Sequence, residues 1–350
     1  MPEILIEQRG QLGLLTLNRP AALNALNAAM VRTLLETLLA WREDPAVGQV
    51  AITGTGSRGF CAGGDIVAIY RDIAQRDGST EEFWRIEYQL NALIDEYPKP
   101  FIALMDGIVL GGGIGISAHG SHRIATERTR CGMPETGIGF FPDVGGTHLL
   151  ATAPRAAGRL AALTGRKFGA ADAMVLGLVD CQVPADSLPA VLDALEAEPV
   201  DQVLRRFAVE PEPGFLDQQW VQAFETESLA EVFGQLEASP EPEAAATLAA
   251  LSAACPSAVR LADELLRRAG ASLREDLGRE FRAAVHRLDD PDFAEGIRAA
   301  VIDKDRTPQW TDFHAGMSHE LRTARHFAPL PGAELNFALL ETAAREGAGA

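Results

Sequence analysis

Two short apolar segments of this chain run into glycine-rich turns, and this pattern most constrains its fold. Val50–Thr53 precedes the turn-rich segment Gly54–Asp65, and Phe101–Met105 precedes the triple glycine 111–113. A short apolar run bounded by turn residues is typical of a buried strand. Helical periodicity over about residues 80–96 separates the two segments. Strands that alternate with helices indicate an α/β architecture.

The N-terminal segment predicts a hairpin followed by a helix. Ile4–Glu7 and Leu12–Leu17 are strand-like and flank Gly10. Asn27 stands where an N-cap is expected, and apolar residues recur behind it at helical spacing until Pro45.

The second half of the chain has a different character. From about residue 185 onward Ala, Leu, Glu and Arg dominate, and strand-like runs become scarce. Prolines predict loops over residues 209–214 and 239–243, and the periodicity of Ser257–Arg268 predicts a helix. We therefore expect a core over residues 1–190 and a mainly helical C-terminal region over residues 191–350.

Composition narrows the classes of function. The 350 residues are 47% hydrophobic and 23% charged, which is typical of a globular chain. The chain has 31 basic and 49 acidic residues, so its formal net charge is −18. Such a surface repels phosphate backbones and anionic lipid, so we expect neither nucleic acid nor a membrane as the main partner.

The N-terminus and the cysteines favour a cytoplasmic protein. The first residues have no basic segment followed by an apolar one, so we expect no signal peptide. The most apolar stretch, residues 101–118, contains Asp106 and five glycines and is a poor membrane helix. The cysteines are widely spaced, which is typical of free thiols in a reducing compartment: Cys61, Cys131, Cys181 and Cys255.

The two glycine turns are candidates for binding an oxyanion. Glycines leave backbone N–H groups uncovered, and N–H groups at a helix start point toward an acceptor. Two such donors aimed at one point, from the turns 61–65 and 111–115, would form an oxyanion hole. The alternative is two tight turns that simply require glycine.

A third segment contains two acidic residues between prolines and glycines. Residues 133–146 include Glu135 and Asp143, eight positions apart, and cannot form one regular helix. A looped path could turn both carboxyl groups into one apolar site, where burial would raise a carboxyl pKa toward general acid–base work. Asp143 could instead cap a helix that begins near Val144, and Glu135 could be a solvated loop charge.

Other motifs are weaker. The glycine spacing fits neither a dinucleotide fingerprint nor a P-loop. Ser117 lies in a segment that almost matches a nucleophile elbow, which leaves a serine hydrolase as a weak alternative. His119 and His122 could share a helix face, but no third ligand is near them in sequence, so we predict no metal site. Cys61 is better explained as a packed thiol than as a nucleophile.

These motifs together resemble the crotonase superfamily, and within it the 3-hydroxyisobutyryl-CoA hydrolases. The resemblance covers most of the chain and includes residues 17–20, 23–27, 60–65, 87–91, 106–107, 111–113, 119–120, 133–136, 141–146, 295–299 and 302–305. It implies stacked ββα turns in a spiral, capped by helices. It also implies an acyl-CoA thioester substrate and neither a metal nor a cofactor beyond the CoA of the substrate.

The resemblance also implies roles for particular residues. The amides of Gly64 and Gly112 would form the oxyanion hole, Glu135 would be the main catalytic carboxyl and Asp143 its partner. Glu87 would line the acyl pocket, so the substrate-binding set would be Glu87, Gly112, Glu135 and Asp143.

The expected activity is hydrolysis of a short 3-hydroxyacyl-CoA, with 3-hydroxyisobutyryl-CoA of valine degradation as the substrate. Enoyl-CoA hydratases place a glutamate two residues after the triple glycine, where this chain has Gly115. The missing glutamate weighs against hydratase or isomerase chemistry on the same fold, which stays the alternative because Asp143 could substitute. A non-catalytic acyl-CoA-binding protein is the second alternative. We expect Arg58 to meet the CoA phosphates and the chain to form a homo-oligomer.

Overall fold

The computed structural model describes residues 1–311 and 319–341. Its larger sheet has the strand order β1-β2-β3-β5-β7-β9. Its strands are β1 (Ile4–Arg9), β2 (Leu12–Leu17), β3 (Gln49–Gly54), β5 (Phe101–Met105), β7 (His122–Ala125) and β9 (Cys181–Gln182). β1 and β2 pair antiparallel, with Ile4 opposite Leu17, and the other neighbours pair in parallel. The predicted hairpin and buried strands are confirmed.

A smaller parallel sheet positions the glycine turns. It consists of β4 (Gly59–Cys61), β6 (Ile108–Leu110) and β8 (Arg130–Gly132), in that order. Along the chain β3, β5 and β7 of the larger sheet are each followed by a strand of the smaller sheet, β4, β6 and β8 respectively, and helices follow these strands. This alternation stacks ββα turns into a spiral, as the resemblance implied, and confirms the α/β class.

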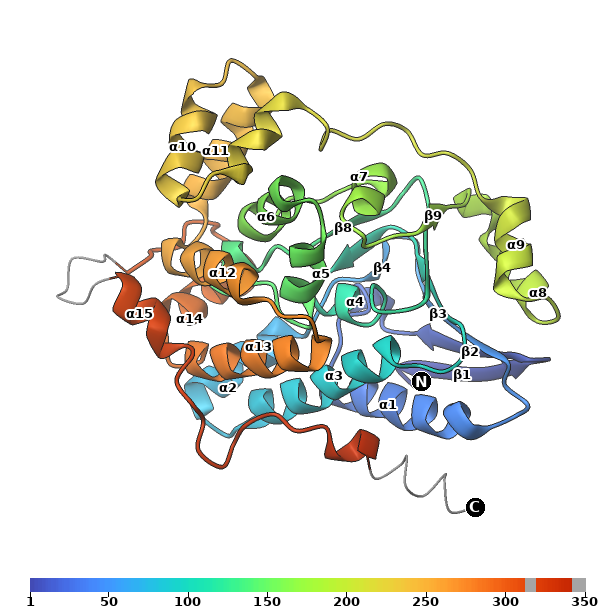
Figure 1. Cartoon of the computed structure of the whole chain (residues 1–350). Helices are drawn as coiled ribbons and strands as arrows, with labels where there is room; N and C mark the ends of the chain where they lie inside the picture. Colours follow the sequence, from blue (N-terminus) through green and yellow to red (C-terminus); the bar gives the residue numbers. More distant parts are fainter. Residues whose placement is uncertain (312–318, 342–350) are drawn as a thin grey trace.

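Helices follow the strands of the first half (Figure 1). They are η1 (Pro20–Ala22), α1 (Ala28–Glu43), α2 (Ile66–Gln75), α3 (Ser79–Asp95), α4 (Gly112–Gly115), η2 (Glu135–Ile138), α5 (Gly146–Thr152), α6 (Arg155–Thr164) and α7 (Ala170–Val175). Asn27 caps α1 as predicted, because its side chain accepts a hydrogen bond from the amide of Met30 at 2.9 Å.

The C-terminal region is mainly helical, as its composition indicated. Its elements are η3 (Ala185–Ser187), α8 (Leu188–Leu195), α9 (Val200–Phe207), η4 (Gln219–Glu225), α10 (Leu229–Ala238), α11 (Pro242–Ala253), α12 (Pro256–Arg268), α13 (Leu273–Arg287), α14 (Pro291–Ile297), the π-helix η5 (Arg298–Ile302) and α15 (His319–Arg325). The loop predicted over residues 239–243 ends earlier than expected, because proline is tolerated in the first turn of a helix and Pro242 begins α11.

The larger sheet is buried on both faces by two hydrophobic cores. On β2, Leu15 and Leu17 belong to the larger core, whereas Leu12 and Leu14 belong to a smaller one that α8 and α9 complete. This alternation follows from the two-residue period of a strand. The larger core also contains side chains of α10–α14, so both halves of the chain contribute to it. The division at residue 190 stays a prediction.

No single helix within residues 1–311 and 319–341 has the length and apolar composition to cross a membrane. One pair, α11 and α12, meets both criteria only when taken together, and its two helices are bent by 107° relative to each other.

Candidate active site

Parallel pairing brings three turns to one edge of the smaller sheet. The turn Cys61–Asp65 follows β4, the glycine run 111–113 follows β6, and Glu135 comes three residues after β8. Because parallel strands all point the same way, the segments that leave their carboxyl ends lie side by side.

The two glycine turns touch each other. A Cβ atom built on Gly63 would lie 3.5 Å from the amide nitrogen of Gly112, and one built on Gly112 would lie 3.3 Å from the amide nitrogen of Gly64. Gly63 and Gly111 have φ angles of 104° and 50°, which favour glycine. Within the described residues the amides of Gly64 and Gly112 have no hydrogen-bond acceptor. Two unused amide donors therefore adjoin one small space.

Glu135 borders this space. It is the first residue of η2, and its Oε1 would lie 2.6 Å from a Cβ atom built on Gly111. The side chain is buried, and Oε2 has no partner in the part of the chain that is described. Burial raises the pKa of Glu135 well above its usual value, and the negative charge of Asp143 raises it further. Glu135 is thus no solvated loop charge.

Asp143 is the second buried carboxyl. Tyr88, on α3, donates its hydroxyl proton to Asp143 Oδ2 at 2.8 Å. Burial raises the pKa of Asp143 to about 7, against the opposing effect of the Tyr88 hydrogen bond. The capping alternative is wrong: α5 begins at Gly146 rather than near Val144, and the side chain of Asp143 makes no capping bond.

The residues after Asp143 are held by distant groups. Val144 has a φ of 54°, a strained value for a β-branched residue, and its carbonyl oxygen lies 2.8 Å from His119 Nε2. Glu280, on α13, accepts hydrogen bonds from the amides of Gly145 at 2.7 Å and Thr147 at 3.0 Å. Its carboxyl thus replaces the missing cap of α5, and burial raises its pKa to about 8.

Glu87 faces the glycine turns from α3. Its Oε1 would lie 2.7 Å from a Cβ atom built on Gly112. The side chain is 2% exposed, and burial raises its pKa well above the usual value, as does the charge of Asp143. The structure therefore brings together every residue of the predicted set around the two glycine turns.

The C-terminal region contacts the turn that carries Glu135. Gly139 and Gly296 let η2 and α14 approach so closely that a Cβ atom on either would strike the backbone of the other segment. Arg287, fully buried on α13, donates from Nε to the carbonyl oxygen of Gly139 at 2.6 Å. These contacts fix the path of the chain from Glu135 to Asp143.

Sequence reasoning assigned no role to Tyr88 or Glu280 and missed how His119 acts. Tyr88 follows the predicted site residue Glu87 in sequence, and this position could have indicated that Tyr88 lies near the site. No local pattern connects Glu280 to Gly145, because they are 135 positions apart. His119 and His122 do not share a helix face, since His119 lies in a turn after α4 and His122 begins β7.

The remaining nucleophile candidates are structural. Cys61 is buried, donates to the carbonyl oxygen of Asn24 at 3.2 Å, and has a pKa raised by burial to about 12, as expected of a packed thiol. Ser117 is fully buried and donates to the carbonyl oxygen of Gly113 at 2.6 Å, which is unlike an exposed nucleophile elbow. Among the described residues no group of three or more His, Cys, Asp or Glu side chains could hold a metal ion.

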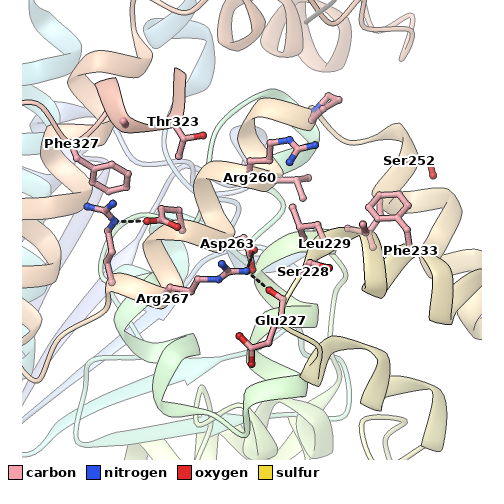
Figure 2. A pocket seen from close by; sticks show the side chains of 17 residues that line it. Glu227, Ser228, Leu229, Phe233, Ser252, Arg260, Asp263, Arg267, Thr323 and Phe327 are labelled. Atoms are coloured by element: carbon pink, nitrogen blue, oxygen red, sulfur yellow. Dashed lines mark hydrogen bonds and ion pairs between the residues drawn. The ribbon is translucent and has the colours of Figure 1, made fainter. Parts of the chain in front are cut away.

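Two cavities lie away from this space, and neither is lined by a predicted catalytic residue. One cavity, of about 1010 Å³, lies among α10, α11, α12 and α15 (Figure 2). Its guanidinium groups are largely occupied, since Arg267 pairs with Asp263 and Arg268 with Glu264. A smaller cavity of about 210 Å³ lies beside Arg58, which donates to the carbonyl oxygens of Pro20 and Ala21.

Fold and site together define an α/β protein in which paired amide donors adjoin buried carboxyl groups. The chain belongs to the enoyl-CoA hydratase/isomerase family of the crotonase superfamily, whose sequence profile matches residues 12–326.

Curated relatives and solved structures carry different names. The chain is 36% identical over 323 residues to the mitochondrial 3-hydroxyisobutyryl-CoA hydrolase of Gallus gallus, covering 88% of this chain and 84% of that protein. It is 33% identical over 353 residues to that of Homo sapiens, covering 96% and 91%. A carnitinyl-CoA dehydratase from Mycobacterium thermoresistibile superposes with a TM-score of 0.91 at 41% identity, covering 96% and 99%. An enoyl-CoA hydratase from Rhodobacter sphaeroides gives 0.88 at 40%, covering 96% and 100%.

Proposed function

We propose that this chain hydrolyses a short-chain 3-hydroxyacyl-CoA thioester, with 3-hydroxyisobutyryl-CoA as its substrate and 3-hydroxyisobutyrate and CoA as its products. One observation carries the proposal: the free amides of Gly64 and Gly112 adjoin the same space as the carboxyl group of Glu135. The names of the curated relatives support this substrate.

The two amides would bind the oxygen of the thioester carbonyl. Negative charge develops on this oxygen when a nucleophile attacks the carbon. Fixed N–H donors stabilise that charge more than they stabilise the ground state, so they accelerate the reaction. Removal of one such donor typically costs about 10²- to 10³-fold in rate.

Glu135 and Asp143 would supply the proton transfers. Burial raises the pKa of both carboxyl groups, and the charge of Asp143 raises that of Glu135 further. Carboxyl groups with raised pKa values suit general acid and general base roles. Glu135 either takes a proton from water, which attacks the carbonyl carbon, or attacks it directly to form a mixed anhydride that water then cleaves. In both routes the carbon–sulfur bond breaks and the thiolate takes up a proton. Asp143 orients the water, holds the substrate hydroxyl or assists this departure.

A thiol-release assay across a panel of acyl-CoA esters tests the proposal. Free thiol from 3-hydroxyisobutyryl-CoA supports hydrolysis. Loss of enoyl absorbance without free thiol indicates hydratase chemistry, and binding without either change indicates a non-catalytic binding protein. Glu135→Gln should abolish turnover while the fold is retained, whereas Glu82→Gln, at an exposed position of α3, should not. Near wild-type activity in Glu135→Gln refutes the role of this residue.

Hydratase or dehydratase chemistry is the second candidate, because the similar solved structures carry such names. The surroundings of Gly115 weigh against it. A Cβ atom there would lie 2.7 Å from Val144 Cβ and 2.9 Å from Asn91 Nδ2, so this chain has no room for a second glutamate at position 115. A hydratase here would need Asp143 in its place.

We also propose the setting of the reaction. The substrate places the enzyme in valine degradation, and the proposed chemistry needs no cofactor, so chelators should leave activity unchanged. The four free cysteines support a reducing compartment, for which we propose the cytoplasm, and cell fractionation tests this. We expect Arg58→Gln to raise KM through the CoA phosphates, and ultracentrifugation to show a homo-oligomer. The net charge disfavours nucleic acid and membrane partners.

A further inference from the structure

Helix α3 directs two polar side chains, one turn apart, at glycines of α4. Glu87 Oε1 would lie 2.7 Å from a Cβ atom built on Gly112, and Asn91 Nδ2 would lie 2.9 Å from one built on Gly115. Positions i and i+4 share one face of a helix. This face of α3 therefore borders α4 from the proposed oxyanion amide of Gly112 to Gly115.

Both side chains have polar atoms without a partner. Glu87 is 2% exposed and Asn91 is 0% exposed. Within residues 1–311 and 319–341, Glu87 Oε1 and both Oδ1 and Nδ2 of Asn91 make no hydrogen bond. Buried polar atoms are normally satisfied, because an unpaired one is costly. A carboxamide with both polar atoms unpaired in a protein interior indicates a group from outside the chain.

The chemistry of these atoms restricts that group. A carboxamide offers two N–H donors and a carbonyl acceptor, and a carboxyl group also accepts. An anion would be repelled by the neighbouring acidic side chains. One of these is Asp143, whose neighbour in sequence, Val144, packs against Gly115. A small neutral group that both donates and accepts fits best, and a hydroxyl group is such a group.

We propose that Asn91, together with Glu87, binds the 3-hydroxyl of the acyl group and thereby selects hydroxyacyl over plain acyl substrates. The proposal rests on the proposed function. The helical rise from Gly112 to Gly115 is about 4.5 Å, comparable to the span from a thioester carbonyl to a hydroxyl on the third carbon. Asn91 occupies the space beside Gly115, where a hydratase has its second glutamate.

The test compares two esters that differ only in this hydroxyl. The kcat/KM for thiol release is measured with 3-hydroxyisobutyryl-CoA and isobutyryl-CoA, for the wild type and for Asn91→Leu. We expect the wild type to prefer the hydroxy ester, and the ratio of the two values to fall about 10- to 100-fold in the variant, through the hydroxy ester alone. The melting temperature should stay level or rise, because no bond to the protein is lost.

Gln89 supplies a matched control on the same helix. Its amide is also buried, but it donates to the carbonyl oxygen of Arg85 at 2.9 Å and accepts from the amide of Leu339 at 3.2 Å. Gln89→Leu should lower the melting temperature and leave the ratio unchanged.

Different outcomes reject different claims. If the wild type releases thiol from neither ester, the proposed function is wrong and this inference with it. If the wild type hydrolyses both esters equally well, or Asn91→Leu keeps the wild-type ratio, the hydrolase stands and the inference is wrong. A lower melting temperature with an unchanged ratio would mean that Asn91 binds only a structural water. Should Asn91→Leu not fold, Asn91→Ser is measured against the same criteria.

Discussion

The hydroxyl of Tyr88 lies 2.8 Å from Asp143 Oδ2 and donates to it, deep in the protein. Burial raises the pKa of Asp143, and the hydrogen bond from Tyr88 is the strongest of the effects that lower it. Tyr88 itself packs edge-on against Phe281, with ring centroids 6.1 Å apart. The side chain of Tyr88 thus contacts both the carboxyl group of Asp143 and a ring of the C-terminal helix α13.

Tyr88→Phe should raise the pKa of Asp143 and move the acidic limb of the activity profile to higher pH. The hydrogen bond that this variant removes stabilises the ionised carboxylate of Asp143. A hydrogen bond to a charged group contributes about 1.5–3 kcal/mol, which corresponds to a pKa shift of roughly one to two units. The measurement is kcat/KM for thiol release between pH 5 and 9. Tyr97→Phe is the control, because Tyr97 donates to the carbonyl oxygen of Leu38, away from the site. An unshifted limb in Tyr88→Phe would contradict the coupling.

Asp143→Asn should gain stability relative to the wild type as the pH rises. A carboxyl whose pKa is raised from about 4 in the unfolded chain to about 7 in the folded one stabilises the fold below pH 4, and this stabilisation is lost as the pH rises toward 7. For one proton, the free energy of unfolding changes by at most about 1.4 kcal/mol per pH unit. Asparagine keeps the shape without the titration. Urea unfolding of both proteins at pH 5 and pH 8 measures the difference, and an equal difference at both pH values would refute it.

Gly112→Ala should lower kcat/KM by about 10²-fold. The new Cβ atom would lie 3.3 Å from the amide nitrogen of Gly64, in the space proposed for the carbonyl oxygen, and 2.7 Å from Glu87 Oε1. Gly137→Ala is the matched control, because no atom lies within 4 Å of a Cβ atom there, on the turn that carries Glu135. Equal activities of the two variants would argue against an oxyanion site at Gly112.

Local patterns predicted the elements that carry the site. The buried strand Phe101–Met105 has the expected bounds, and its apolar run with a following glycine turn is a short-range signal. The pairing of the turns at Gly64 and Gly112 follows from parallel strands, which the α/β alternation implied. For this reason the predicted site residues meet, although their roles in catalysis stay predictions.

Local sequence patterns could not predict the contacts that residues distant in sequence make with the site. Nothing near Glu280 in sequence indicates that its carboxyl group accepts a hydrogen bond from the amide of Gly145. The free amides at the N-terminus of a helix can donate to any carboxylate that the tertiary structure brings close. By spacing His119 and His122 could share a helix face, but the chain turns between them. Burial lowers the His119 pKa to about 4, and Nε2 of its ring lies 2.8 Å from the Val144 carbonyl oxygen. These contacts depend on packing, which single-sequence periodicity does not encode.

Gly296→Ala should lower both stability and activity, although it lies in the C-terminal region. A Cβ atom there would come 2.7 Å from Ile138 Cα and closer still to the Ile138 carbonyl group, so α14 must shift away from the turn that begins at Glu135. Overpacking against backbone typically costs about 1–3 kcal/mol. Gly278→Ala, in α13 with no atom within 4 Å of the added Cβ, should instead stabilise its helix by about 0.5–1 kcal/mol at unchanged activity. Urea unfolding and thiol release measure both variants. Wild-type turnover in Gly296→Ala would mean that the Glu135 turn keeps its geometry without α14, and the C-terminal helices would then have no part in positioning this carboxyl.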